Sequence, residues 1–301
     1  MKITSLLFCV GLLTNSFSQL DSTNLNQNNV SAFISDDGTF FYDYLSDRKG
    51  YEVPRGSEKY ALKTMQFWFA AKDGNGQIHF SQGGVPGQGT DIFNGPISDP
   101  GTYSSQQYQD SWGKAVWTIC QSAIDNYELQ YQCNQDPNCT DIFPVSNDDL
   151  DMINSWPAHG EWTDGQSFYL APYYDNPGNN GNVDGIYDPA QGDLPIIKGC
   201  CATYTIQNDQ AQAHTLTNTD PIGIELHIMF YQYRTWDYLN DVTFVDVMAI
   251  NNSNVDYPEF VHSVVVDADI GNDTDDFFGC DSLSNTMYFY NADNNDENSS
   301  Q

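Results

Sequence analysis

Positive charge is scarce in this chain of 301 residues, which has 10 Lys and Arg against 41 Asp and Glu and a formal net charge of −31 at pH 7. Such a negative field repels phosphate groups, so nucleic acid and anionic membrane surfaces are poor partners. Only 7 of the acids are Glu. Because Asp favours turns, loops and metal sites over helices, this bias predicts a low helix content.

Common catalytic and zinc signatures are missing. The chain has five scattered histidines, no His-Glu-x-x-His and no Cys-x-x-Cys, and residues 165–169 lack the final glycine of a nucleophile elbow. Acid and base pairs such as Glu161 with Asp164, or Glu225 with a loop Asp, leave a secreted hydrolase as the weakest alternative. His227 lies two residues from Glu225 on one expected strand face, where a structural hydrogen bond is favoured over catalysis.

One apolar run stands out, near the N-terminus. Lys2, the apolar residues 6–13 and the small residues Ser16 and Ser18 predict a secretory signal peptide over residues 1–18. The run is too short to span a bilayer and no later run is longer, so we expect no membrane span. The protein is therefore predicted to be secreted or at the cell surface, with an N-terminal linker over residues 19–27.

Six cysteines follow the predicted signal peptide: Cys120, Cys133, Cys139, Cys200, Cys201 and Cys280. An even number in an exported chain favours disulfides, although six cysteines allow about fifteen full pairings. Cys133 and Cys139 bracket a short polar loop and are the best local pair. Cys200 and Cys201 are adjacent on an expected strand, so they face opposite ways and should have different environments.

The order of patterns predicts a mainly β fold, an antiparallel β-sandwich-like module with long loops and one or two short helices. We expect this module over residues 28–290, as one unit or as subregions 28–110 and 195–290 with a loop-rich insert between them. Residues 291–301 read as an acidic polar tail, truncated from a longer chain. The expected strands are residues 30–34, 39–44, 62–71, 77–80, 201–207, 222–233, 242–251, 260–266 and 286–290.

Some elements carry sharper expectations. Alternating apolar residues in 222–233 predict a strand with one buried face, whereas residues 242–250 are apolar on both faces, which predicts a central strand. One short helix is expected over residues 119–129. A second is expected from an N-cap at Ser146 to about Trp156.

Residues 267–276 place five carboxylates directly after an expected strand. Clustered hard oxygen ligands suit calcium, and five like charges so close would otherwise repel one another. The alternative is a solvated acidic loop without metal. The predicted ligands here are Asp267, Asp269, Asp273, Asp275 and Asp276.

Residues 180–193 suggest a second calcium loop, because their Asn-x-Asn-x-Asp-Gly pattern is similar to an EF-hand-like loop. Gln191 replaces the usual bidentate Glu, so the affinity should be modest and suited to extracellular calcium. A hairpin loop without metal is the alternative. The predicted ligands are Asn180, Asn182, Asp184, the carbonyl of Ile186, Asp188 and Asp193, with Asp175 as an extra candidate.

Ordered sequence blocks resemble the N-terminal region of large secreted cell-surface proteins of Bacteroidota, whose full-length members usually end in a type IX secretion sorting domain. The blocks span nearly the whole chain after the signal peptide. They are Asn28-Asn-Val30, Tyr51-Glu-Val-Pro-Arg-Gly-Ser57, Phe67-Trp68, Asp73-Gly-Asn-Gly-Gln-Ile-His79, Gly89-Thr-Asp-Ile-Phe-Asn-Gly-Pro96, Trp156-Pro-Ala-His-Gly160, Asp184-Gly-Ile-Tyr-Asp-Pro189, Gly192-Asp193, Pro195, Gly223-Ile-Glu-Leu-His227 and the segment from Asp267 to Asp281.

The resemblance implies an exported surface or adhesion role and brings no catalytic mechanism. This chain departs from the pattern by extra residues at 176–179 and by the absence of a sorting module. We therefore expect a non-enzymatic, calcium-stabilised module whose partners are surface glycans or other cell-surface proteins. A carbohydrate-binding module is the main alternative, because exposed rings stack on sugars. Its candidate rings are Trp156, Trp162, Phe168, Tyr169, Tyr173 and Tyr174.

Overall fold

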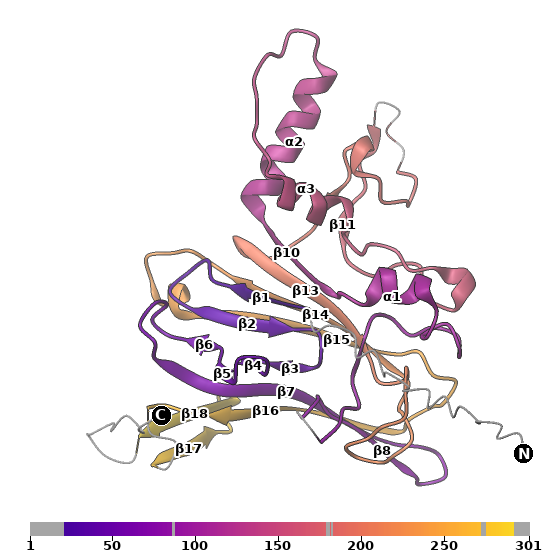
Figure 1. The fold of residues 1–301 in the computed structure, drawn as a ribbon, viewed down its shortest axis with the longest axis vertical. Helices are drawn as coiled ribbons and strands as arrows, with labels where there is room; N and C mark the ends of the chain where they lie inside the picture. The colour runs from indigo at the N-terminus through magenta and orange to yellow at the C-terminus, as the bar shows by residue number, and fades with distance from the viewer. Residues whose placement is uncertain (1–20, 86–87, 179–180, 182, 272–274, 292–301) are drawn as a thin grey trace, which may run out of the picture.

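The computed structural model describes residues 21–85, 88–178, 181, 183–271 and 275–291, and it confirms the mainly β, antiparallel sandwich-like class. The first sheet (Figure 1) has the order β1 (Ser22–Leu25), β2 (Ser31–Ser35), β6 (Tyr51–Glu52), β7 (Tyr60–Lys72) and β16 (Glu259–Ala268), and β3 (Thr39–Phe40) and β8 (Ile78–Ser81) also pair with β7. The second sheet has the order β10 (Val116–Cys120), β13 (Cys201–Asn208), β14 (Ile224–Gln232) and β15 (Thr243–Asn251), and β9 (Phe93–Asn94) pairs with β13.

Three small strand pairs complete the described sheet structure: β4 (Tyr42–Asp43) with β5 (Arg48–Lys49), β11 (Tyr173–Tyr174) with β12 (Leu194–Pro195), and β17 (Asp276–Asp281) with β18 (Thr286–Asn291). The described α-helices are α1 (Gln106–Trp112), α2 (Gln121–Gln135) and α3 (Asn147–Asn154). Short 3₁₀ helices cover Trp162–Asp164, Pro189–Gln191 and Tyr238–Asp241. Each expected subregion contributes a strand to the sheet formed mainly by the other. β9, from residues 28–110, joins the second sheet, and β16, from residues 195–290, joins the first.

An apolar core fills the space between the two sheets. Phe40 of β3 and Phe230 of β14 are fully buried, with their ring centroids 4.7 Å apart. Ile224, Leu226 and Ile228 line the same face of β14. Removing these large side chains from water supplies the main stabilisation of the sandwich.

A second core lies on the other face of the second sheet. There Met229 and Tyr231 of β14 pack with Trp156 and Ile153 of the loop-rich insert, residues 91–198. The expectation of one solvated face on β14 was wrong, since all nine residues of the strand are buried. The insert covers that face, and α2 projects away from the sandwich beyond it (Figure 1).

β15 occupies an edge position, which corrects the prediction of a central strand for residues 242–250. It pairs with β14 on one side, and no described strand pairs with its other side. Several of its residues are exposed, including Val247 and Met248. The apolar residues on both faces of β15 therefore do not mean that the strand is central in the sheet. Some of these side chains are exposed at the surface of the protein.

The helices are more numerous than expected. Ser146 caps α3 as predicted, accepting a hydrogen bond from the N–H of Asp149 at 3.1 Å. The helix expected over 119–129 begins only at Gln121, because Val116–Cys120 forms β10 against β13. α1 was not predicted. Residues 22–25, expected within a linker, form β1 and pair with β2.

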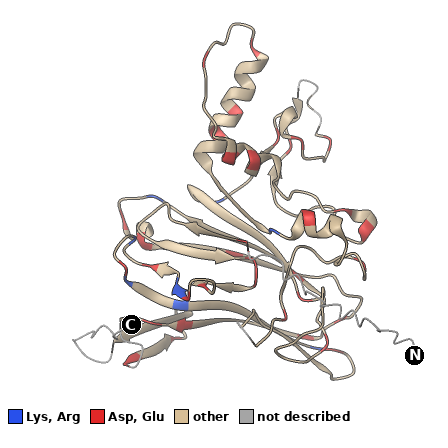
Figure 2. Cartoon of the chain, viewed as in Figure 1, with Lys and Arg blue, Asp and Glu red and all other residues tan. Residues whose placement is uncertain are grey.

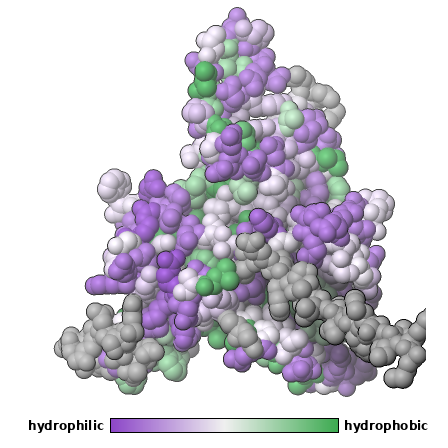
Figure 3. Space-filling model, viewed as in Figure 1, coloured by the Kyte–Doolittle hydropathy of each residue, from purple (hydrophilic) through white to green (hydrophobic). Residues whose placement is uncertain are grey.

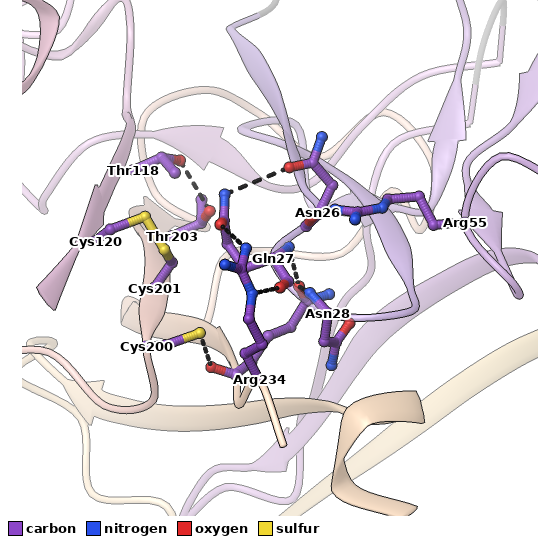
Figure 4. Close-up of a disulfide and its surroundings, with 11 residues drawn as sticks. Asn26, Gln27, Asn28, Arg55, Thr118, Cys120, Cys200, Cys201, Thr203 and Arg234 are labelled. Carbon is purple, nitrogen blue, oxygen red and sulfur yellow. Dashed lines mark hydrogen bonds between the residues drawn. A yellow bond between two sulfur atoms is a disulfide. The ribbon is translucent and has the colours of Figure 1, made fainter. Parts of the chain in front are cut away.

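Two disulfides hold the described chain. Cys133–Cys139 confirms the expected local pair at the end of α2, and Cys120–Cys201 joins β10 to β13. Cys200 makes no disulfide, and its thiol donates to the carbonyl oxygen of Gln232 at 3.2 Å. The adjacent Cys200 and Cys201 thus have different environments, as expected. Close to Cys120–Cys201, Arg234 donates to the Gln27 carbonyl at 2.8 Å and fixes the chain that leads into β2 (Figure 4).

Candidate functional site

The acidic segment after β16 begins with a buried carboxylate. Asp269 is 3% exposed, its Oδ2 lies 2.7 Å from Nζ of Lys49, and its N–H donates to the carbonyl of Ala61 at 3.2 Å. Figure 2 shows the basic residues of this region at β5 and the adjoining part of β7. A buried carboxylate needs such a partner, because an unpaired charge away from water is costly.

Three side-chain oxygens of this acidic segment and the hairpin after it are buried without a hydrogen-bond donor. They are Oδ1 of Asp269, Oδ1 of Asp275 and Oδ1 of Asn291. Asp276 connects these residues, since its Oδ2 accepts the N–H of Ile270 at 2.9 Å and it faces Asn291 in the β17–β18 ladder. Leaving a buried oxygen unpaired costs about 1–3 kcal/mol, and such a group in a native structure requires an explanation.

The remaining predicted ligands of this segment are placed differently. The side chain of Asp267 is 59% exposed and its carboxylate is 4.0 Å from Lys63. Asp273 lies outside the described residues. Asp276 begins β17, so the acidic loop is shorter than expected. Within the part of the chain that the structure describes, no three His, Cys, Asp or Glu side chains form a group that could hold a metal ion.

In the second predicted loop, backbone N–H groups bind the carboxylates. Asp184 accepts the N–H of Ile186 at 2.9 Å, and Asp175 accepts that of Gly185 at 2.7 Å. Asp188 caps the 3₁₀ helix Pro189–Gln191. Asn180 and Asn182 lie outside the described residues.

Asp193 organises this second loop from within. It is 2% exposed, and its two oxygens accept the N–H groups of Asn176 and Asp188 at 2.8 and 2.7 Å. Burial raises the pKa of Asp193, and the charges of Asp175 and Asp184 raise it further. Asp175 and Asp184 are thus close enough to repel a charge on Asp193, while backbone N–H groups hold the loop in place.

A third acidic group, formed by Asp21, Asp36 and Asp37, was not recognised as a candidate from the sequence. Asp36 is buried and accepts hydrogen bonds from the N–H of Asp21 at 3.2 Å and from Nδ2 of Asn94 at 2.6 Å. Burial, followed by the charges of Asp21 and Asp37, raises the pKa of Asp36 to about 8. Burial also raises the pKa of Asp37 to about 6. Since Asp21 is far from Asp36 in sequence, no spacing signal could have found the group.

The expected hydrogen bond between His227 and Glu225 is present. Nε2 of His227 lies 2.8 Å from Oε1 of Glu225, and Nδ1 lies 2.7 Å from the hydroxyl of Tyr204. The other oxygen of Glu225 accepts the N–H of Ile97 at 2.7 Å. The side-chain polar atoms of Tyr204, His227 and Glu225 therefore all have hydrogen-bond partners. This is the pattern of a structural network.

A mostly apolar groove of about 570 Å³ lies over this network. Its floor includes Tyr204, His227 and Met229, and its walls include Tyr169 and Tyr173 of the insert. Apolar grooves with a few polar groups are typical small-ligand sites.

A smaller and more polar cavity of about 260 Å³ contains the proposed acid and base pair, Glu161 and Asp164, together with His159. The hydroxyl of Thr163 and its N–H donate to Glu161 and lower the pKa of this exposed carboxyl. A general acid needs a raised pKa, so this environment does not favour Glu161 as the acid of such a pair.

The candidate sugar-binding rings divide into two groups. Trp156 is buried in the second core, and its indole N–H donates to the carbonyl of Pro172 at 2.9 Å. Trp162, Tyr169 and Tyr174 are exposed, by 68%, 65% and 45%. The rings of Phe168 and His159 stack with centroids 4.3 Å apart beside Tyr169. Only part of the aromatic set can therefore meet a ligand.

No protein-family model matches this chain, and neither a curated protein nor a solved structure matches it. The resemblance to Bacteroidota surface proteins therefore stays a prediction. Among the described helices, none is long and apolar enough to cross a bilayer.

Proposed function

We propose that this protein is an exported, non-enzymatic module of the cell-surface or adhesion type, stabilised by calcium at the base of the β17–β18 hairpin. The observation that carries the proposal is the set of buried, donor-free oxygens on Asp269, Asp275 and Asn291. Hard oxygen donors are the ligands that calcium prefers. A cation bound there would satisfy oxygens that the described chain leaves unpaired.

Charge supports the same assignment. Lys49 partners only one oxygen of Asp269, and Asp275 forms no ion pair with a described Lys, Arg or His. Asp276 adds a further carboxylate beside them, and Asp273 belongs to the ligand set by sequence alone. Bound calcium would link the end of β16 to both strands of the hairpin. It would thereby order a segment that follows the first sheet.

The second loop is a weaker calcium candidate. Asp175, Asp184, Asp188 and Asp193 each accept a backbone N–H, so the loop has a fold without an ion. Carboxylates retain lone pairs after one hydrogen bond, so a cation would still relieve the repulsion at Asp193. We expect this site to bind calcium less tightly than the Asp269 site.

Native mass spectrometry and thermal unfolding with and without about 1 mM calcium, an extracellular level, test the proposal. We expect a bound calcium ion and a higher melting temperature. Asp269→Asn should remove that increase. Asp267→Asn is the matched control, since its carboxylate is exposed and beside Lys63, and it should retain most of the increase. Equal calcium responses in both variants, or no response in the unmodified protein, would overturn the calcium assignment.

Carbohydrate binding is a second candidate function, favoured by the exposed Trp162, Tyr169 and Tyr174. Exposed rings of this kind stack on the apolar faces of sugars. A glycan array probed with the unmodified protein and with Trp162→Ala and Tyr169→Ala variants tests it. Binding that disappears in either variant would support a glycan-binding role, and an empty array would remove it.

A further inference from the structure

The two edge strands β15 and β16 leave one side of the sandwich open. On the opposite side, β1 of the first sheet lies against β10, β13 and β14 of the second. β16 pairs only with β7, and β15 only with β14, among the described strands. The backbone groups on their outer edges thus lack strand partners, which is the arrangement that accepts an added strand.

Apolar side chains that point between the sheets are exposed along this open side. Phe260 and Val264 of β16 lie opposite Ala71 and Phe67 in the β7 ladder, so they share the core face of the sheet. They are nevertheless 43% and 49% exposed. Val247 of β15 faces the same core and is 37% exposed. The edge therefore lacks a strand that would supply apolar side chains to the space between the sheets.

β16 is the better acceptor of the two edge strands. It is ten residues long and more exposed than β15, and like β15 it contains no proline, glycine or lysine. Natural sheets commonly protect exposed edges with such residues or with short strands. Figure 3 shows small hydrophobic areas among hydrophilic ones at the lower side of the molecule, where β16, β17 and β18 lie.

Charge indicates which kind of strand fits. Glu259 and Asp267, near the two ends of β16, have side chains 66% and 59% exposed, and Lys72 and Lys63 contact them from β7. If two copies paired through β16 about Ser263, Glu259 of each copy would oppose Asp267 of the other. Like charges placed directly opposite are destabilising, and the net charge of −31 adds repulsion between copies.

We propose that β16 is a strand-acceptor edge for an extended segment of a different protein, with apolar residues at alternate positions and Lys or Arg at its ends. The apolar residues would lie beside Phe260 and Val264 between the sheets. The basic ends would face Glu259 and Asp267. The proposal names a partner class for the binding role proposed above, and it does not depend on the calcium site.

A labelled peptide, Lys-Val-Thr-Val-Thr-Val-Thr-Val-Lys, tests this by fluorescence anisotropy against the full chain, in calcium and in chelator. Two further peptides carry N-methyl groups at the even or at the odd positions. Because alternate N–H groups of an added strand face the acceptor, one methylated peptide should lose at least about tenfold in affinity and the other should retain it. Absence of binding by the unmethylated peptide, or equal binding by both methylated peptides, would overturn the proposal.

Two protein variants locate the site. Val264→Asp places a charge on the core face of β16 and should weaken peptide binding at least about tenfold, whereas Val261→Asp, on the opposite face and 61% exposed, should weaken it much less. Circular dichroism confirms that both variants fold. A dimer in sedimentation velocity that Val264→Asp dissociates would assign the edge to a second copy and overturn the proposal. If the peptide binds equally well in chelator and mass spectra show no bound calcium, the strand-acceptor proposal holds. The calcium assignment then fails independently.

Discussion

Cys120 of β10 lies directly opposite Cys201 of β13, and a disulfide joins the two strands. The bridge connects residues 81 apart in sequence. It therefore fastens the start of α2, and with it the insert, to the second sheet. The Cys133–Cys139 bridge, in contrast, closes a short loop at the end of α2, where its two residues are 6 apart.

The two disulfides should contribute unequally to stability. In the chain-entropy account, a bridge across 81 residues stabilises by roughly 4 kcal/mol and one across 6 residues by roughly 2 kcal/mol. Replacing Cys120 and Cys201 by Ser should lower the free energy of unfolding about twice as much as replacing Cys133 and Cys139. Urea unfolding measures both losses. Equal losses would show that the long bridge adds little beyond the ladder around it.

Asp36 should make stability fall as the pH rises. Its folded-state pKa of about 8 exceeds the ordinary value of 3.8, so the folded protein holds a proton that the unfolded chain releases. Between these pKa values the folded state binds one more proton than the unfolded state. Each rise of one pH unit therefore lowers the free energy of unfolding by up to about 1.4 kcal/mol. Asp36→Asn should flatten this slope between pH 4 and 8, as followed by chemical unfolding.

The exposed Asp110 of α1 provides the control for that experiment. Asp110→Asn should leave the pH slope as it is in the unmodified protein. A slope that survives in Asp36→Asn would mean that other carboxyls, Asp37 first among them, account for it.

Glu225 should contribute strongly to the stability of the fold. Its carboxyl is fully buried and binds His227 and the N–H of Ile97. Glu225→Ala leaves Nε2 of His227 and the N–H of Ile97 unpaired in the interior and should cost about 3 kcal/mol or more. Glu259→Ala removes an exposed ion pair with Lys72 and should cost less than about 1 kcal/mol. Thermal unfolding compares them, and similar melting temperatures would contradict the structural role.

Asn291 should support calcium binding without carrying a charge. Its buried Oδ1 has no donor, and its place opposite Asp276 brings it to the base of the hairpin. Asn291→Ala should weaken calcium binding by about tenfold or less, since one neutral ligand is lost while the carboxylates remain. Asn138→Ala, in the loop after α2, serves as a control with unaltered affinity. Isothermal titration with calcium distinguishes the two, and equal affinities would remove Asn291 from the site.

Strand positions were largely predictable from sequence because alternation and β-branched residues are local signals. β7, β13, β14 and β16 all lie where the patterns placed them. The burial of Glu225 and His227 was not predictable, since it depends on an insert that returns from far away in the chain. β15 looked central because its residues are apolar on both faces, although it is an edge strand with apolar side chains at the surface.

The candidate site was predictable only in part. The density of Asp in residues 267–276 indicated the region, but Lys49 and Asn291 reach it from other strands. Their positions depend on how the strands pair, so the spacing of residues in the sequence could not reveal them. The local disulfide Cys133–Cys139 was predictable for the opposite reason, because both cysteines border one short loop.

The cover that the insert provides over the second sheet limits how this protein can be divided. A shortened chain without residues 91–198 would lose β10 and expose Tyr204, Met229 and Tyr231 to water. Such a hydrophobic sheet face favours aggregation over independent folding. Fragment design, proteolytic trimming and domain swapping should therefore treat this irregular segment as inseparable from the strands beneath it.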